Sequence, residues 1–336
     1  MEAAVHGLAR WQVRHGHDVR VITLKRLHSG EPRLVDGVHE GVRYQRLSSV
    51  GPGRYPVPLG LTAAVGRPDF VHVHGVDGIA DVAVRRLSAP VGISTHGGYF
   101  HTDRQRYLKQ AVLRTLTRAT LRRADGVFYT SQADAERFAA TGVRGQVLGN
   151  GVDIDRFRTE RRPEVGRWVM LGRVQEHKGL ADLARWLPAL DVTVHVVGEV
   201  VDADHVRDVV RGLRAAGSDH KMVVHGALED DAVRDQLARA ELLVAPSRSE
   251  GFGIAVVEAM GAGVPALVSA DTALAERVAD GGGWALDFRA PDAASRLSAF
   301  VGADHTDVGA RARQVAAQYG WDQVGAQWEQ AIQRIV

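Results

Sequence analysis

The chain has 336 residues, of which 45% are hydrophobic and 24% charged, with a formal net charge of +2 and no cysteine. The length suffices for two domains, and with a near-balanced charge any basic partner site has to come from local clustering, so no nucleic-acid partner is expected. The composition excludes disulfides and thiolate metal sites, and no apolar run approaches the roughly 20 residues of a membrane-spanning helix. Since the charged N-terminus is unlike a signal peptide, we expect a cytoplasmic protein.

The chain opens with a helical pattern that ends at Gly16, and a strand pattern follows at 19–23. A doubly wound domain normally begins with a central strand and a glycine-rich turn. We therefore expect that Met1 is an internal methionine, and that the first sheet lacks a strand beside 19–23 or 70–74. A domain that simply begins with a helix is the alternative.

Apolar runs alternate with helical patterns along the rest of the chain, which is typical of parallel sheets covered on both faces. The alternation pauses at the charged, proline-containing stretch 159–166, which we interpret as an interdomain linker. The sequence thus predicts an α/β protein with doubly wound domains at 1–160 and 166–318 and a last helix at 322–336. Strands are expected at 19–23, 70–74, 91–95, 126–130, 167–171, 192–197, 221–225, 241–245 and 265–269.

The stretch 247–269 is apolar and rich in glycine, yet it contains Glu250 and Glu258. After the strand at 241–245 we expect a turn at 250–253 and a helix from Ile254 to about 261. The glutamate inside this helix needs an explanation, because a buried carboxylate without partners is costly. The paired hydroxyls of a ribose would satisfy both of its oxygens. A glutamate that is simply solvated near a helix start is the alternative.

The turn before this helix is a candidate anion site. The backbone N–H groups of Phe252, Gly253 and Ile254 are expected to be free at the helix N-terminus, where phosphates bind. The glycines Gly251 and Gly253 would let a ligand approach the backbone closely.

Two cations follow the strand at 167–171. Arg173 lies at the carboxyl end of this strand and Lys178 at the start of the next helix, so both are expected to face the same crevice as Ile254. Two cations beside a helix N-terminus can neutralise a diphosphate without a metal. Ordinary surface charges on a loop are the alternative.

These residues carry a family resemblance. The stretch SEGFGIAVVEAMGAGVPALVS, with GRVQEHKG upstream, resembles the nucleotide-sugar site of retaining glycosyltransferases of family 4. The resemblance extends over GLARWQVRHGHDVRVIT, over NGVDIDRF with Gly149 in place of the usual proline, and over the terminal YGWDQVGAQWEQAIQRIV. It implies a GT-B fold, in which two Rossmann-like domains face each other across a cleft and the last helix crosses back to the first domain.

The resemblance also implies residue roles. Glu258 would bind the ribose, Arg173 and Lys178 would hold the donor diphosphate, and the backbone of residues 252–254 would cap the phosphates. Glu250 would contact hydroxyls of the donor sugar. Fixed positive charge beside the departing diphosphate would lower the barrier. Since no conventional carboxylate pair is evident, a front-face route is implied, in which the leaving phosphate takes the proton of the acceptor.

His96 follows the strand at 91–95 in the string STHGGYFHT. It corresponds to the histidine that contacts the donor sugar in the family, although a histidine at a strand end is more often structural. The whole string resembles bacterial exopolysaccharide mannosyltransferases. This implies GDP-mannose as the donor and a lipid-diphosphate-linked oligosaccharide as the acceptor, while the residues themselves leave open a UDP-sugar and another glycan or small-molecule acceptor.

The stretch 104–123 contains seven basic residues and no acidic one. Leu108, Val112, Leu116 and Ala119 form an apolar stripe at helical spacing. Such a helix can contact an anionic membrane at the inner face of the bilayer. An ordinary amphipathic helix that covers the sheet is the alternative.

No metal is expected. The acidic triplets at 153–155 and 202–204 fit a family segment and a helix start, and the histidines show no zinc-binding spacing. A nucleotide-sugar donor is expected to be the only small molecule needed. Besides a glycosyltransferase, two interpretations stay open: a nucleotide-sugar epimerase on the same fold, and a catalytically impaired nucleotide-binding protein.

Overall fold

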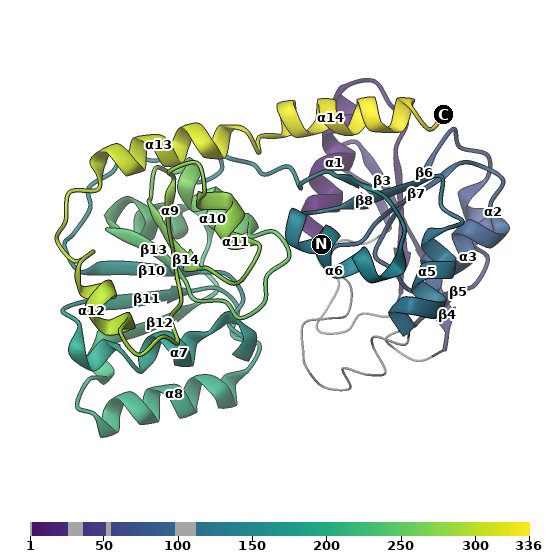
Figure 1. The fold of residues 1–336 in the computed structure, drawn as a ribbon. Coiled ribbons are helices and arrows are strands. Elements are labelled where there is room, and N and C mark those ends of the chain that lie inside the picture. The colour runs from purple at the N-terminus through teal and green to yellow at the C-terminus, as the bar shows by residue number, and fades with distance from the viewer. Residues whose placement is uncertain (1, 26–35, 52–54, 98–111) are drawn as a thin grey trace. The chain divides into compact units, whose positions relative to one another are not determined.

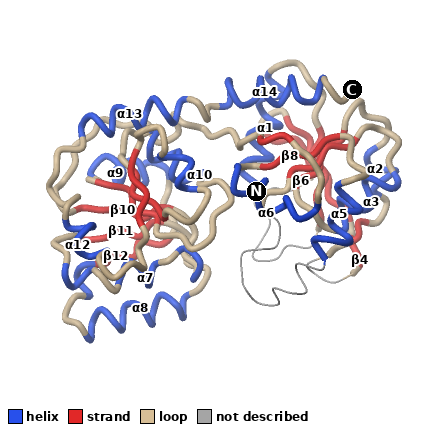
Figure 2. Tube along the Cα trace, in the orientation of Figure 1, coloured by secondary structure: helices blue, strands red, loops and turns tan. Residues whose placement is uncertain are grey.

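Figures 1 and 2 show the structure, a computed structural model of the chain that describes residues 2–25, 36–51, 55–97 and 112–336. Its contacts divide the chain into two compact α/β units. Unit 1 comprises Met1–Gly151 and Trp321–Val336, and unit 2 comprises Val152–Gly320. All nine strands predicted from the sequence are present, with bounds within one residue of those expected.

Unit 2 is built on six parallel strands in the order β12-β11-β10-β13-β14-β15. Counted from β10, this is the order 3-2-1-4-5-6 of a doubly wound nucleotide-binding sheet. The winding reverses between β10 and β13, so the ligand crevice is expected at the carboxyl ends of these two strands. The elements are β10 (Arg167–Leu171), α7 (Leu180–Ala184), β11 (Thr193–Val197), α8 (Ala203–Ala215), β12 (Met222–Gly226), α9 (Asp230–Arg239), β13 (Leu242–Ala245), α10 (Ile254–Gly261), β14 (Ala266–Ser269), α11 (Leu274–Val278), β15 (Gly283–Leu286), α12 (Ala293–Ser298) and α13 (Thr306–Ala317).

Each face of this sheet has its own hydrophobic core. Along β10 the side chains alternate between the faces, as the pleat of a strand requires. Val169 packs with residues of α9, α10 and α13, whereas Trp168 and Met170 pack with residues of α7, α8 and α12. All three side chains are buried. The apolar run that predicted β10 is therefore continuous because helices cover both faces.

Unit 1 contains two larger sheets. One has the order β1-β3-β2, and the other has the parallel order β6-β7-β8-β9. Among the described residues β1 pairs only with β3 and β6 only with β7, so each has one edge without a described neighbour. The elements are α1 (Glu2–Arg14), β1 (Arg20–Leu24), β2 (Gly37–His39), β3 (Val42–Leu47), β4 (Ser49–Val50), β5 (Val57–Pro58), α2 (Leu61–Val65), β6 (Val71–His74), α3 (Gly78–Arg86), β7 (Val91–Ser94), α5 (Arg118–Leu121), β8 (Gly126–Tyr129), α6 (Gln132–Phe138), β9 (Gln146–Val147) and α14 (Trp321–Gln333).

The last helix, α14, belongs to unit 1 and packs on α1. Two glycine–tryptophan contacts hold the helices together. A Cβ atom on Gly7 would lie 2.2 Å from Trp321, and a Cβ atom on Gly325 would lie 2.2 Å from Trp11. Both indole rings therefore occupy space that only a glycine leaves open.

The charged stretch 159–166 differs from its interpretation as a linker, because it belongs to unit 2 and lies along α9. The Arg162 N–H donates to the Ala238 carbonyl (2.8 Å), and the Glu164 N–H donates to the Arg239 carbonyl (2.9 Å). The Glu164 carboxylate also accepts from Arg239 Nε (2.6 Å). Its charges thus find partners within unit 2, and the division between the units falls earlier, at Gly151 and Val152.

We predict that Gly325→Ala lowers the free energy of unfolding by about 1–3 kcal/mol, because the new methyl group overlaps the buried Trp11 ring. Gly212 is the matched control, since it lies inside α8 and no neighbouring segment comes within 4 Å of the place that its Cβ atom would take. Gly212→Ala should be neutral or stabilising, because alanine favours a helix. Denaturant unfolding followed by circular dichroism measures both. Equal stability of the two variants would contradict the packing described for α1 and α14.

Candidate functional site

The turn before α10 lies at the carboxyl end of β13. Gly253 adopts a φ of 91°, and the helix begins at Ile254, as predicted. Among the described residues, the backbone N–H groups of Phe252, Gly253 and Ile254 donate to no acceptor. The Phe252 side chain is buried, with Arg277 over its ring at 4.5 Å and Tyr319 against its edge. Phe252 thus anchors the turn through its side chain, which leaves the three free N–H groups suited to an anion.

Glu258 lies one turn into α10, and only 13% of its side chain is exposed. Burial raises the pKa of Glu258 to about 7, with smaller contributions from the neighbouring carboxylates Asp153 and Asp230. Arg156 opposes this rise, with its Nη1 at 3.5 Å from Glu258 Oε1. The same guanidinium forms two hydrogen bonds with Asp230, at 2.9 and 2.7 Å. Glu258 is therefore neither free nor simply solvated, and Arg156 is a site residue that the sequence analysis did not single out.

Lys178 and Glu250 form an ion pair through Nζ and Oε2. Both side chains are largely buried, with 23% and 21% exposed. The two loops meet because Gly179 approaches the residue after β13 closely: a Cβ atom there would lie 1.9 Å from the Pro246 carbonyl oxygen. The structure therefore brings together two residues to which the sequence assigned separate contacts, the diphosphate and the sugar.

Arg173 stands apart from the other cations of this edge. Its side chain is exposed, and it makes no ion pair with the described residues. By contrast, Arg248 forms two hydrogen bonds with the Asp182 carboxylate, at 2.6 and 2.8 Å. Arg173 is thus a cation whose charge no described carboxylate compensates, whereas Arg248, in the loop that carries Glu250, is neutralised by Asp182 of α7.

The acidic triplets make structural contacts. Asp202 accepts a hydrogen bond from the His205 N–H (3.0 Å) and begins α8, as the sequence predicted for a helix start. Asp204 pairs with Arg207, and Asp155 pairs with Arg158 at 3.3 Å. In the described part of the chain, neither triplet forms a group of three potential metal ligands.

His96 of unit 1 follows β7 and adopts a φ of 46°, which is unusual for a residue other than glycine. Its Nε2 shares a hydrogen bond of 2.9 Å with Nδ1 of His74, and the His74 ring lies against that of His72, with the ring centroids 4.0 Å apart. His72 Nε2 lies 2.7 Å from Ser94 Oγ. Burial holds the pKa of His96 well below its usual value and lowers the pKa of His74 to about 4. A chain of neutral imidazoles thus orients His96; the alternating histidines of the strand at 70–74 were the signal for it.

The predicted basic helix is described only from residue 112, and the remainder of 104–123 lies outside the described residues. A π-helical turn at Leu113–Thr117 precedes α5. The buried side chains are Leu113, Thr117, Thr120 and Leu121. Leu116 of the predicted apolar stripe is 36% exposed and lies outside this buried set, so in this part the stripe does not cover the sheet. None of the helices in the described part of the chain has the length and apolar character that crossing a bilayer requires.

Comparisons with known proteins identify the family of the chain. The family model described as "Glycosyltransferase Family 4" matches residues 1–156, and "Glycosyl transferases group 1" matches residues 152–318. The chain is 31% identical over 284 residues to the GDP-mannose:cellobiosyl-diphosphopolyprenol alpha-mannosyltransferase of Xanthomonas oryzae pv. oryzae (strain PXO99A), which covers 80% of this chain and 74% of that protein. The protein of the same description from Komagataeibacter xylinus is 29% identical and covers 100% of this chain and 90% of its own length.

A solved structure of similar fold supports the same assignment. A sucrose-phosphate synthase from Thermosynechococcus elongatus aligns with a TM-score of 0.79 at 18% identity, over 98% of this chain and 92% of that one. Such a likeness at low identity concerns the fold, which for each unit is the Rossmann-like half of a GT-B protein. The chain belongs to glycosyltransferase family 4.

Proposed function

We propose that this glycosyltransferase transfers mannose from GDP-mannose to a lipid-diphosphate-linked oligosaccharide, with retention of the anomeric configuration. The chain uses a nucleotide-sugar donor, as its family does. The choice of mannose and of a lipid-linked acceptor rests on the mannosyltransferases that it resembles over most of its length. The single structural observation that supports nucleotide binding is the buried carboxylate of Glu258, one turn below the free N–H groups of α10.

In the proposed complex, unit 2 holds the nucleotide part of the donor. The free N–H groups of Gly253 and Ile254 donate to a phosphate oxygen, and the ribose hydroxyls donate to Glu258. Arg173 and Lys178 stabilise the diphosphate as the glycosidic bond breaks, because negative charge grows on the leaving group at that stage. Glu250 exchanges its bond with Lys178 for hydroxyls of the sugar.

We assign His96 of unit 1 to a contact with the donor sugar. A neutral imidazole can donate one hydrogen bond and accept another, which suits a sugar hydroxyl. His74 holds one ring nitrogen of His96 and so acts as a positioning residue. The exposed Leu116, with Arg114 and Arg118 beside it in sequence, supports a contact with an anionic membrane that carries the acceptor.

The purified enzyme tests this proposal when it is given GDP-mannose or UDP-glucose together with a short synthetic lipid-diphosphate disaccharide. We expect mannose transfer from GDP-mannose, with an α-linkage in the product by NMR. Transfer only from the UDP-sugar would overturn the donor assignment. Release of a free epimerised nucleotide sugar without transfer would instead identify an epimerase.

The pKa of Glu258, at about 7, predicts a pH-dependent nucleotide affinity. Ribose hydroxyls need an ionised acceptor, so the affinity for GDP should rise between about pH 6 and pH 8. Glu258→Gln should weaken binding at the upper pH by about 1–3 kcal/mol and flatten the profile. Arg156→Met should move the midpoint to higher pH, because Arg156 lowers the pKa of Glu258. Isothermal titration calorimetry measures each profile, and an unchanged profile in Glu258→Gln would remove the ribose role.

The raised pKa of Glu258 also affects the free energy of unfolding. The folded state holds the Glu258 proton more tightly than the unfolded chain does, so ionisation of this group costs folding free energy. Its cost is absent below the ordinary pKa of 4.5 and grows as the pH rises to about 7. The free energy of unfolding of Glu258→Gln should therefore lack this fall over that range.

We predict that Arg173→Ala and Lys178→Ala each lower kcat by roughly 100-fold while they change the affinity for GMP little, because their charges act on the leaving diphosphate. Arg207→Ala is the matched control, since Arg207 is an exposed cation of the same unit whose ion-pair partner among the described residues is Asp204. Steady-state kinetics and GMP titrations provide the two readouts. Equal losses in GMP affinity and turnover would contradict a role in the chemical step.

A further inference from the structure

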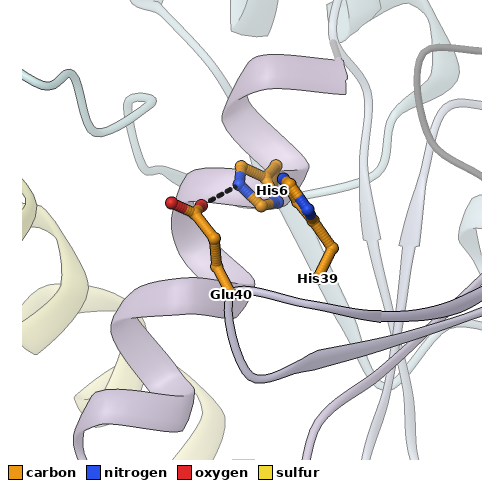
Figure 3. A group of neighbouring side chains, drawn as sticks. All are labelled: His6, His39 and Glu40. Atoms are coloured by element: carbon orange, nitrogen blue, oxygen red, sulfur yellow. Dashed lines mark hydrogen bonds and ion pairs between the residues drawn. The ribbon is translucent and has the colours of Figure 1, made fainter.

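Three potential metal ligands of unit 1 come together where α1 meets the turn between β2 and β3. His6 lies on α1, His39 ends β2, and Glu40 begins the turn (Figure 3). One ligand atom from each residue lies within 4.8 Å of the other two. His6 Nε2 is 2.7 Å from Glu40 Oε2. The group was invisible in the sequence, because more than thirty residues separate His6 from the other two and no short spacing joins them.

The second ring nitrogen of His6, Nδ1, already has a hydrogen-bond partner. Its Nδ1 lies 2.5 Å from the hydroxyl of Tyr44 on β3. Tyr44 is 8% exposed and belongs to a small core with Ala9 of α1 and Val42. Metal-binding histidines almost always have their other ring nitrogen fixed in this way, which sets the tautomer and the ring orientation. In the structure the Nε2 of His6 is hydrogen-bonded to the Glu40 carboxylate. When an ion replaces this bond, a proton on Nδ1 that is donated to Tyr44 would leave the Nε2 lone pair for the metal.

The turn that carries Glu40 breaks a local sequence rule. Glu40 and Gly41 have φ values of 50° and 82°, and they connect paired residues His39 and Val42. This is a two-residue hairpin turn with positive φ at both positions, where asparagine or glycine is strongly preferred at the first. A glutamate is an unfavourable choice there, and such departures from local preference are expected at functional positions. Its position sets the Glu40 carboxylate beside His6 (Figure 3).

We propose that His6, His39 and Glu40 bind a divalent transition-metal ion of the zinc type. Two imidazoles and a carboxylate form a known zinc donor set with room for a water molecule as the fourth ligand. Imidazole ligands favour such ions over Mg²⁺ or Ca²⁺. Around a tetrahedral zinc ion the ligand atoms lie about 3.4 Å apart. The three ligand atoms here lie within 4.8 Å of one another and would adjust to this spacing by side-chain rotation. The bound ion would join α1 to the β2–β3 hairpin.

Arg10 is the natural competitor for the ion. Its Nε lies 3.0 Å from Glu40 Oε2, so the guanidinium forms an ion pair with the carboxylate when no metal ion is bound. A divalent ion has to displace this partner or share the carboxylate with it. The site is therefore expected to bind zinc more weakly than it would without Arg10. Removal of Arg10 should raise the affinity for Zn²⁺, whereas removal of a ligand residue should lower it.

The test uses the full chain, treated with a chelator and desalted, and titrated with Zn²⁺ in a calorimeter and with Co²⁺ in a visible spectrometer. One equivalent of Zn²⁺ should bind, and Co²⁺ should show the absorption of a low-symmetry site. His39→Ala and His6→Ala should each weaken Zn²⁺ binding at least tenfold. His17→Ala is the matched control, because His17 is an exposed histidine of unit 1 whose ion-pair partner among the described residues is Glu329, and it should leave the affinity unchanged.

Arg10→Gln should tighten Zn²⁺ binding, which a site elsewhere on the surface would not do. Circular dichroism of each variant establishes that it is folded, and His39→Ala is the safer variant because His39 is exposed on an edge strand. No Zn²⁺ binding to the chelator-treated chain would overturn the proposal. Affinity unchanged in both His6→Ala and His39→Ala, or equal affinity for Mg²⁺, would also overturn it. Glycosyl transfer in the presence of the chelator is a separate readout, which depends on the proposed function alone.

Discussion

A buried carboxylate constrains the edge of unit 2 at which the proposed donor-binding residues lie. Glu258 is largely removed from water, and an uncompensated charge there would be costly. Arg156 compensates part of that charge, and Asp230 at the start of α9 fixes Arg156 through two hydrogen bonds. The segment that carries Arg156, which follows the division between the two units, is thereby tied to α9 and α10. One buried charge thus determines the course of the chain as it enters unit 2.

The strand order explains why this charge lies at the edge of the sheet where we propose the donor site. β10 and β13 are neighbours although two other strands separate them in the sequence, and the loops after them both leave the sheet at the same edge. In a doubly wound sheet this reversal opens a crevice that side chains of the sheet do not fill. Gly253 lets the second loop turn directly into α10, so the first N–H groups of the helix remain available.

The sequence was sufficient where a feature depends on local pattern. Nine strands, the start of α10 and the cap of α8 follow from runs of apolar residues and from a glycine or aspartate at a boundary. It was insufficient for contacts between distant segments: the pairs Arg156–Glu258 and Lys178–Glu250 depend on which loops the sheet brings together. The strand β3 was missed because Arg43 and the adjacent pair Gln45 and Arg46 interrupt its sequence, VRYQRL, which therefore has no continuous apolar run. The stretch 159–166 looked like a linker since its partners on α9 lie more than seventy residues away.

Three cations of unit 2 near the proposed donor site already have ion-pair partners, unlike Arg173, so a donor would have to exchange partners with them. Lys178 faces Glu250, Arg248 faces Asp182, and Arg156 faces both Asp230 and Glu258. Such pairing keeps partly buried cations from being uncompensated, but it also means that a diphosphate gains from Lys178 only the difference between two interactions. A sugar that hydrogen bonds to Glu250 reduces this loss, because it satisfies the carboxylate that Lys178 leaves. In the proposed complex, binding of the diphosphate and binding of the sugar therefore favour each other. A nucleotide without its sugar is expected to use Lys178 less well than the complete donor does.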